Sequence, residues 1–512
     1  MQRFLEIYTK TNEGVNTKQM KKRIACIAIV VLLLIAFGAT VTIDWLYDTF
    51  GNLSMDEIIF HLKVPMEGTN TDIIFKFLKQ CLWKVILPTA IISFVLIYPM
   101  VKDIKIIKEI HTSERRRTTV TSLCISILIL IVSIDKIIKT TDIKQYIESQ
   151  SHNSSFIANE YVRPEKTQIE FPEQKRNLIY IFLESMETTY YSTKDGGLSK
   201  DDLIPEISKL AKENVNFSDT DKLGGAYALT GTTWTVGAMA AQTAGVPLKL
   251  SIEDNAMGEY STFLPGAYSI GQVLKNNGYH NYLLVGSDAS FGGRRNLFKQ
   301  HGDYEIWDFE SAKEENKATE KIWWGFTDDQ LFDYAKEKIT NLASQDEPFN
   351  FTMLTADTHF PDGFLCKDCP NKWDEQYKNV ISCSSKRVGD LVKWIKQQDF
   401  YDNTTIVISG DHLTMQSNFF ELEEGQQYDK KVVNLIINPA VEVENTNRIY
   451  STMDLYPTTL GALGANISGN RLALGTNLFS DEKTLIEKYG VQYVNEELKK
   501  ISRYYNNTIL VK

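Results

Sequence analysis

Long apolar runs without charged residues occupy the first quarter of the chain. The segment from Ile24 to Ile43 reads IACIAIVVLLLIAFGATVTI, and two further uncharged runs cover 85–101 and 118–134. A helix of roughly 20 apolar residues, rising about 1.5 Å per residue, crosses the hydrocarbon core of a membrane, and about 17 residues suffice. The pattern therefore predicts transmembrane helices over 24–43, 85–101 and 118–134, within a membrane anchor formed by residues 1–137.

The first apolar run is expected to be retained as an anchor. It is longer than the apolar region of a typical signal peptide, and no cleavage site of small residues clearly follows it. The amphipathic stretch from Met55 to Leu62 is a different kind of segment. It is expected to lie on the membrane surface, with a fourth, irregular span as the alternative.

The basic residues around these runs predict the orientation of the chain. The region 44–72 carries six acidic residues and a single lysine, Lys63, whereas basic residues precede the first span and lie between the second and third. The basic positions are Lys18, Lys21, Lys22, Arg23, Lys102, Lys105, Lys108 and Arg115 to Arg117. Because basic loops stay in the cytoplasm, we expect a multi-pass protein of the cell (inner) membrane with a cytoplasmic N-terminus and an extracytoplasmic soluble part.

The pattern changes after the third run. Residues 138–175 are polar and are predicted to be a linker, and 176–512 are predicted to be a folded soluble domain. In that domain apolar, strand-length runs alternate with segments of helical periodicity. The strand-like runs are NLIYIFLES, HNYLLVGS, FNFTMLTADTH and TTIVISGDHL, and the helical segments are IPEISKLAKENV, YSIGQVLKNNGY and KRVGDLVKWIKQQ. This alternation predicts an α/β fold with a mostly parallel central sheet covered on both faces.

Polar residues follow the predicted strands at their carboxyl ends, where ligands bind in such sheets. Glu184 ends the first run, and Asp411 and His412 end the last. Asp357 and His359 follow a third run. Glu184 taken alone is typical of a helix cap, but carboxylates combined with one imidazole suit a divalent metal ion. Because nitrogen ligands are few, Mn²⁺ is expected first, with Mg²⁺ or Zn²⁺ as alternatives.

The uncharged segment LTGTTWTVGAM contains four threonines, at 230, 232, 233 and 235. The small residues after it predict a tightly packed helix that begins near Trp234 and Thr235. A hydroxyl there would face the positive end of the helix, which favours an alkoxide and a bound phosphate. Thr235 is the predicted nucleophile, and Thr233 is the alternative because it is only two residues away.

Net charge and cysteine usage limit the function further. The net charge of −10, without a basic run in the soluble part, disfavours nucleic acid as a partner. Cys366, Cys369 and Cys383 lie together in the soluble part. In an oxidising compartment one of the first two is expected to pair with Cys383. A redox CxxC motif lacks a thioredoxin-like context, and a zinc site would need His359 as its fourth ligand.

The chain resembles a known family through five motifs in order. They are NLIYIFLES, the threonine segment followed by AAQTAGVP, TADTHFPDGF, SGDHL, and DLYPTTLGALG with GTNLF. These motifs resemble the alkaline-phosphatase/sulfatase superfamily and, within it, the membrane-bound phosphoglycerol transferases, including lipoteichoic acid synthase. TWTVGAMAAQTAGVP, DTHFPDGF and HLKVPMEGT resemble more closely the enzymes that decorate membrane-derived oligosaccharides.

The resemblance implies a role for each matching position. It implies Glu184, Asp411 and His412 as metal ligands, together with Thr235 as both ligand and nucleophile. His359 and Arg294 are the implied substrate contacts, although Arg295 adjoins the latter. The segment WWGFTDDQLF adds Trp324 and, more weakly, Asp328. Relative to lipoteichoic acid synthase, Gly292 replaces an aromatic residue, and a histidine is missing near Val285.

The implied reaction takes phosphoglycerol from phosphatidylglycerol and gives it, through a covalent glycerophospho-threonine, to a glycan or polyglycerophosphate acceptor in the cell envelope. A phosphoethanolamine transferase is the main alternative. A catalytically inactive binding protein on the same fold is a second one, disfavoured by the intact set of ligands. A sulfatase would need a C/S-x-P-x-R motif, which the threonine segment lacks.

Overall fold

The structure is a computed structural model, and it describes residues 2–50, 53–63, 71–101, 112–249, 262–318, 320–416, 419–420 and 427–510. These residues form two compact units, one made of 1–51 and 70–144 and the other of 52–69 and 145–512. The basic loop residues 102–111, and residues 64–69 of the HLKVPMEGT segment, lie outside the described part of the chain.

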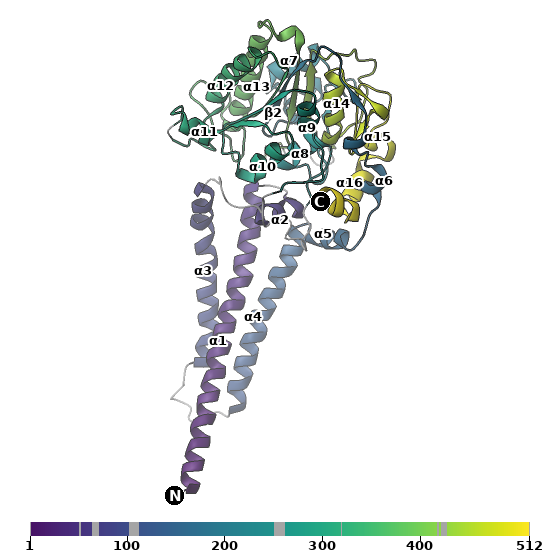
Figure 1. Cartoon of the computed structure of the whole chain (residues 1–512). Helices are drawn as coiled ribbons and strands as arrows, with labels where there is room; N and C mark the ends of the chain where they lie inside the picture. Colours follow the sequence, from purple (N-terminus) through teal and green to yellow (C-terminus); the bar gives the residue numbers. More distant parts are fainter. Residues whose placement is uncertain are drawn as a thin grey trace. The chain divides into compact units, whose positions relative to one another are not determined.

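The first unit consists of three long helices that pack side by side, as Figure 1 shows. They are α1 (Gln2–Phe50), α3 (Thr71–Val101) and α4 (Thr112–Thr140). Each contains a stretch long and apolar enough to cross a membrane, over Met20–Phe50, Ile74–Met100 and Arg117–Thr140. Ile29 and Leu33 of α1 pack with Leu96 of α3, whereas other large apolar side chains of these helices, such as Phe94, point outward. An apolar outer surface is what a lipid environment requires.

A seven-stranded sheet forms the centre of the second unit, in the order β3-β8-β7-β2-β6-β4-β5. The five strands from β7 to β5 run parallel, and β8 and β3 add an antiparallel edge. The strands are β2 (Asn177–Leu183), β3 (Gly225–Ala226), β4 (His280–Val285), β5 (Glu305–Trp307), β6 (Phe349–Leu354), β7 (Thr404–Gly410) and β8 (Val432–Ile437). The predicted α/β fold with a mostly parallel sheet is confirmed.

Helices cover both faces of this sheet because its central strands are apolar on both sides. Along β2, Tyr180 and Phe182 join one core cluster, and Ile179 and Ile181 join the other. This is the alternation expected of a strand. One cluster includes α8 (Thr235–Ala244), α9 (Ile270–Asn276), α10 (Arg294–Gln300), α14 (Leu455–Ala462), α15 (Leu485–Tyr489) and α16 (Val491–Lys499). The other includes α7 (Pro205–Glu213), α11 (Phe309–Glu314), α12 (Asp328–Ala343) and α13 (Gln376–Ile395).

Two segments differ from the expectations drawn from the sequence. The predicted linker contains regular structure, namely α5 (Ile143–Gln150), α6 (Phe156–Glu160) and β1 (Ile169–Glu170), which pairs with β9 (Asn466–Ile467). The amphipathic stretch forms α2 (Met55–Lys63), but its Ile59 is buried in a core cluster of the second unit. At Ile59 the helix therefore packs on protein.

Candidate active site

Adjacent strand ends bring the candidate ligands together. β2 lies between β6 and β7 and runs parallel to both, so their carboxyl ends meet at one edge of the sheet. Glu184 follows β2 directly, and its N–H donates to the Thr355 hydroxyl beyond β6 at 3.0 Å. Asp411 follows β7, and its carboxylate accepts from the N–H of Ser185 at 2.8 Å. Ser185 has a φ of +55°, which turns the chain sharply after Glu184.

Glu184, Asp411 and His412 form a buried group whose ligand atoms lie within 4.8 Å of one another. His412 Nε2 lies 3.4 Å from Glu184 Oε1 and 3.5 Å from Asp411 Oδ2. The Nδ1 of His412 is 2.7 Å from the carbonyl of Leu413, so the ring points Nε2 toward the carboxylates. Sequence reasoning assigned these three residues to one metal site, and the structure brings them together.

The group fits a divalent cation. Asp411 Oδ2 is buried and accepts no hydrogen bond from the described residues, which suits an oxygen that binds a metal ion. Burial and the nearby charge of Glu184 raise the pKa of Asp411. Burial lowers the pKa of His412, but the charges of Asp411 and Glu184 outweigh it and raise that pKa overall. The two carboxylates therefore favour positive charge at this position.

Thr235 is the first residue of α8, and its hydroxyl faces the group. The oxygen lies 3.5 Å from Glu184 Oε2 and 3.4 Å from His412 Nε2. The hydroxyl of Thr230 donates to Asn495 Oδ1, and the hydroxyl of Thr232 donates to the Leu229 carbonyl. The helix begins where the sequence predicted, so the positive end of its dipole lies beside these ligands.

The two adjacent arginines have different partners. Arg294 is buried, and its Nη2 donates to the Ser287 hydroxyl and the Asp288 carbonyl at 3.0 and 2.8 Å. Burial lowers the pKa of Arg294 to about 10, while the charge of Glu184 is the largest opposing influence. Arg295 instead forms an ion pair with the buried Asp308. The residue that interacts with the ligand group is therefore Arg294.

The rings of His359 and Trp324 pack against each other. Their ring centroids lie 4.6 Å apart, and Trp324 also contacts Phe291, over which Arg294 lies. Burial lowers the pKa of His359, with Glu184 as the largest opposing influence. Its Nδ1 is 2.8 Å from the Phe360 carbonyl, so a neutral ring presents Nε2 as an acceptor.

Asp328 supports the loop after β6. Its carboxylate accepts from the N–H groups of Ala356 and Asp357, and its own N–H donates to Asp357 at 3.1 Å. Burial raises the pKa values of both carboxyls. This carboxyl pair holds the backbone that carries His359.

Two departures from the family pattern have structural explanations. Gly292 has a φ of +67°, a conformation that an aromatic residue rarely adopts. Val285 is the last residue of β4 and is buried in the core, so an apolar side chain fits there.

The cysteines follow the expected pairing. Cys369 and Cys383 form a disulfide, and Cys366 is left as a buried free thiol beside it. His359 does not belong to this group of three among the described residues, so the zinc alternative lacks its fourth ligand.

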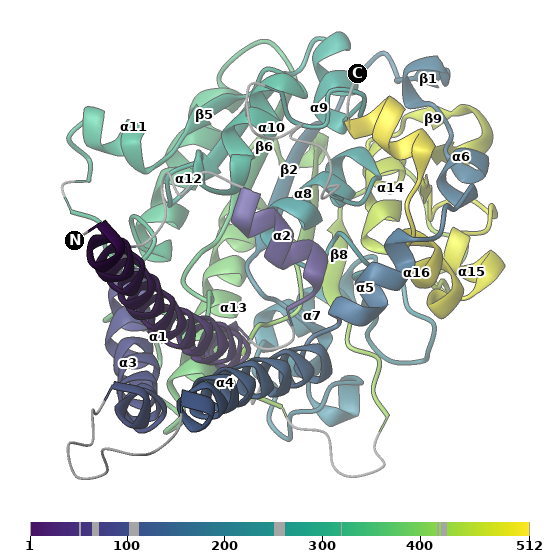
Figure 2. The same ribbon diagram turned by 90° about the horizontal axis from the view of Figure 1, so that it is seen from below.

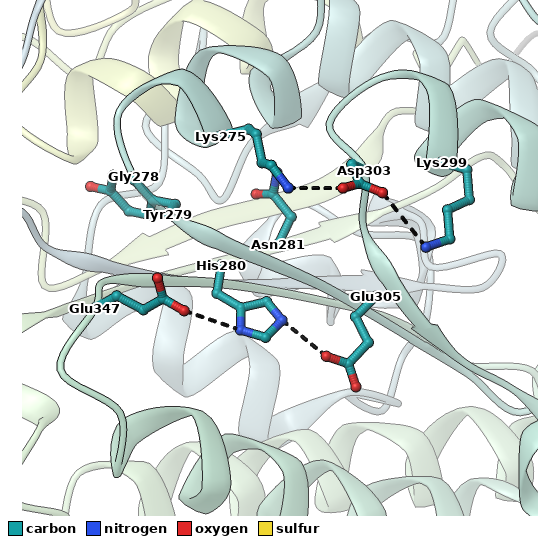
Figure 3. A pocket seen from close by; sticks show the side chains of 9 residues that line it. All are labelled: Lys275, Gly278, Tyr279, His280, Asn281, Lys299, Asp303, Glu305 and Glu347. Atoms are coloured by element: carbon teal, nitrogen blue, oxygen red, sulfur yellow. Dashed lines mark hydrogen bonds and ion pairs between the residues drawn. The ribbon is translucent and has the colours of Figure 1, made fainter.

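A pocket lies at the amino end of β4. Figure 3 shows His280, the first residue of that strand, between Glu305 and Glu347, with ring nitrogens 3.0 and 3.5 Å from the carboxylates. Lys275 and Lys299 both contact Asp303. The charged groups here are paired with one another, so the pocket is a weaker candidate than the strand-end site.

Sequence reasoning missed several residues around the ligands. Ser185 donates to Glu184 Oε1 at 2.8 Å, and Thr358 donates to the Glu184 carbonyl at 2.6 Å. Both adjoin predicted site residues in the sequence, which is the signal that could have found them. Glu57 of α2 also interacts electrostatically with His412, and nothing local in the sequence indicates this.

A mostly parallel sheet with a threonine hydroxyl, two carboxylates and an imidazole at its carboxyl edge defines an alkaline-phosphatase-like α/β protein. The profile of the family described as Sulfatase matches residues 176–465. The chain therefore belongs to the sulfatase family.

Comparisons with known proteins agree with this class. Phosphoglycerol transferase I of Escherichia coli (strain K12) is 31% identical over 369 residues, which cover 70% of this chain and 46% of that protein. The chain thus spans about half the length of the curated relatives it matches. The predicted resemblance to the membrane-bound phosphoglycerol transferases is confirmed.

Two solved structures are also similar. The lipooligosaccharide phosphoethanolamine transferase A (EptA) of Neisseria meningitidis, an integral membrane protein, has a TM-score of 0.51 at 11% identity, covering 86% of this chain and 84% of that chain. The lipoteichoic acid synthase LtaP of Listeria monocytogenes has a TM-score of 0.48 at 16% identity, covering 64% of this chain and 82% of that chain. The likeness to EptA shows a shared fold.

Proposed function

We propose that the protein is a membrane-bound, metal-dependent phosphoglycerol transferase. It takes phosphoglycerol from phosphatidylglycerol and passes it to a glycan or polyglycerophosphate acceptor of the cell envelope. The observation that carries the proposal is the Thr235 hydroxyl, 3.5 Å from Glu184 Oε2 and 3.4 Å from His412 Nε2. The name of the curated relatives, phosphoglycerol transferase I, supports the same transfer.

The reaction consists of two displacements at phosphorus. Thr235 Oγ1 attacks the phosphorus of phosphatidylglycerol and loses its proton. The bond from phosphorus to the diacylglycerol oxygen breaks, and that oxygen takes up a proton as diacylglycerol leaves. An acceptor hydroxyl then attacks the phosphorus of the glycerophospho-threonine and loses its proton. The bond from phosphorus to Thr235 Oγ1 breaks, and that oxygen takes up a proton. Overall configuration at phosphorus is retained.

The surrounding residues orient the phosphate and limit the charge that builds up on it. Arg294 carries a guanidinium held in place by Ser287 and Asp288, which suits a phosphate oxygen. His359 presents Nε2 as an acceptor for a substrate hydroxyl. Glu184, Asp411, His412 and Thr235 would hold a divalent cation, Mn²⁺ in preference to Mg²⁺ or Zn²⁺. Such a cation supplies positive charge that lowers the pKa of the threonine hydroxyl.

The membrane anchor concentrates the site at its lipid donor. We assign residues 1–137, apart from α2, to the anchor, 138–175 to the connection and 176–512 together with α2 to the catalytic domain, with the N-terminus cytoplasmic and the catalytic domain outside. Holding enzyme and lipid on one surface raises their effective concentration. This arrangement would explain why three membrane-length helices accompany the domain.

Donor selectivity distinguishes this function from phosphoethanolamine transfer. The full chain in detergent, supplied with Mn²⁺, should release diacylglycerol from phosphatidylglycerol much faster than from phosphatidylethanolamine. Thr235→Ala is the matched negative control. Release mainly from phosphatidylethanolamine would overturn the proposal, and release from neither lipid would favour the inactive binding protein.

A further inference from the structure

A second buried glutamate lies three positions after the metal ligand Glu184. Glu187 is fully buried in the loop that follows β2. Strand β7 pairs in parallel with β2 and ends directly before Asp411 and His412. Figure 2 shows β2 near the middle of the sheet, with β6 on one side and β8 on the other. Glu187 therefore comes from the strand next to the one whose end carries two of the three ligands.

Both carboxylate oxygens of Glu187 have partners of their own. Oε1 accepts a hydrogen bond from the Thr189 hydroxyl, and Oε2 accepts one from the N–H of Thr414 at 2.8 Å. Lys430 Nζ lies 3.9 Å from Oε1. Among the described residues Glu187 does not belong to the metal-ligand group. The carboxylate thus acts on its protein neighbours, which satisfy the polar oxygens that burial takes out of water.

The N–H of Thr414 belongs to the same peptide unit as the carbonyl of Leu413. A trans peptide unit is planar, with its N–H and its C=O on opposite sides. The Leu413 carbonyl lies 2.7 Å from Nδ1 of His412. A carbonyl oxygen can only accept, so Nδ1 is the donor and Nε2 faces the carboxylates. Holding the N–H of this unit therefore fixes the acceptor that orients the His412 ring.

Tyr377 of α13 holds Thr414 from a second side. Its buried phenol donates to the Thr358 carbonyl at 3.0 Å and lies 2.9 Å from the Thr414 hydroxyl. A phenol has one proton to donate, so the Thr414 hydroxyl is the donor to Tyr377. Thr414 is thus bound through its N–H and through its side chain, and hydrogen bonds in such a buried network strengthen one another.

We propose that Glu187 is a positioning residue for the cation site: it holds the Leu413–Thr414 peptide and thereby orients the ring of His412. This inference rests on the proposed metal-dependent transfer and adds to it a residue that does not bind the metal itself. The reach of the Glu187 side chain matters more here than its charge, because an uncharged amide oxygen also accepts from an N–H.

Two substitutions separate reach from charge. Glu187→Asp keeps the charge, but its side chain is one methylene shorter and loses the hydrogen bond to Thr414. Glu187→Gln keeps the reach and one acceptor oxygen. Thr189→Val is the matched control, because it removes the other hydrogen bond of Glu187 and leaves Oε2 unchanged.

The measurement is the Kd for Mn²⁺ of the full chain in detergent, obtained from the EPR signal of the free ion. Thermal unfolding with a chelator reports whether each variant is folded. Glu187→Asp should raise the Kd by about 10- to 100-fold, the usual effect of losing a group that orients a metal-binding histidine. Glu187→Gln and Thr189→Val should stay within about threefold of the parent.

A Kd for Glu187→Asp within about threefold of the parent would overturn this inference alone. A loss of affinity above about tenfold in Glu187→Gln would also overturn it, and this outcome can be measured even if Glu187→Asp does not fold. A parent that binds Mn²⁺ but releases no diacylglycerol from phosphatidylglycerol would overturn the proposed function and leave this inference standing. A parent that binds no Mn²⁺ would overturn both.

Discussion

The hydroxyl oxygen of Thr235 lies 3.4 Å from Nε2 of His412, although 177 positions separate the two residues in the sequence. Thr235 begins α8, and His412 follows the end of β7, so the fold brings a helix N-terminus to the carboxyl edge of the sheet. A hydroxyl at this position can meet a cation and a phosphate together.

Replacing the nucleophile should separate Thr235 from its neighbour Thr233. Thr235→Ala should lower the rate of diacylglycerol release by about 10³-fold or more, because no other hydroxyl can form the covalent intermediate. Thr235→Ser should retain part of the activity. Thr233→Ala is the control, and its rate should remain close to that of the parent. A larger loss of rate in Thr233→Ala than in Thr235→Ala would show that Thr233 is the nucleophile.

Removing metal should lower both activity and stability. Mn²⁺ at about 100 times its Kd should stabilise the folded chain by about 2.7 kcal/mol, because the ion binds the folded site only. Thermal unfolding with and without a chelator measures this gain. Asp411→Asn should abolish the gain, because it removes the charge of a carboxylate whose Oδ2 accepts no hydrogen bond from the described residues. An equal Mn²⁺ shift in the variant would contradict the assigned site.

The adjacent arginines should respond differently to substitution. Arg294→Ala should lower kcat/KM by about 10²-fold, because the variant lacks the buried guanidinium that is proposed to bind the phosphate. Arg295→Ala should mainly lower the Tm, because it leaves the buried Asp308 without its ion pair. Steady-state kinetics and thermal unfolding of both variants check this. A reversed pattern would move the substrate contact to Arg295.

The Asp328 and Asp357 pair should make stability depend on pH. Burial and the charge of Asp328 raise the pKa of Asp357 to about 9, so the folded protein keeps a proton that the unfolded chain releases. The contribution of this group to the free energy of unfolding is complete below the pKa of the unfolded chain, about 3.9. It is lost as the pH rises from there toward about 9, by at most about 1.4 kcal/mol per pH unit. Asp357→Asn mimics the protonated form and should avoid this loss.

The check is the difference in Tm between Asp357→Asn and the parent, measured in metal-free buffer from pH 5 to pH 9. The variant should gain on the parent steadily as the pH rises. A constant difference across this range would show that Asp357 is already ionised in the folded state.

Local patterns in the sequence predicted much of the fold and the site. The continuous apolar run before Glu184 predicted a strand buried on both faces, and the small residues after Thr235 predicted a helix that begins there. Strand ends in a parallel sheet meet at one edge, so Glu184, Asp411 and His412 could be assigned to one site before their distances were known.

Other features depend on contacts between distant segments and carried no local signal. Arg294 and Arg295 are neighbours in the sequence, where only the family resemblance favours Arg294, and the ion pair of Arg295 with Asp308 separates their roles. The burial of Ile59 joins α2 to the core of the catalytic unit, whereas the amphipathic pattern of this helix fits a membrane surface equally well. Strand β8 pairs antiparallel with β7, a pairing that an apolar run alone does not indicate.

The most direct test of the central claim is the mass of the chain after brief incubation with phosphatidylglycerol and Mn²⁺ in the absence of an acceptor, followed by acid quenching. The account predicts a glycerophosphoryl adduct that peptide mapping locates on Thr235 and that is missing from Thr235→Ala. An adduct on another residue, or one that persists in Thr235→Ala, would contradict it.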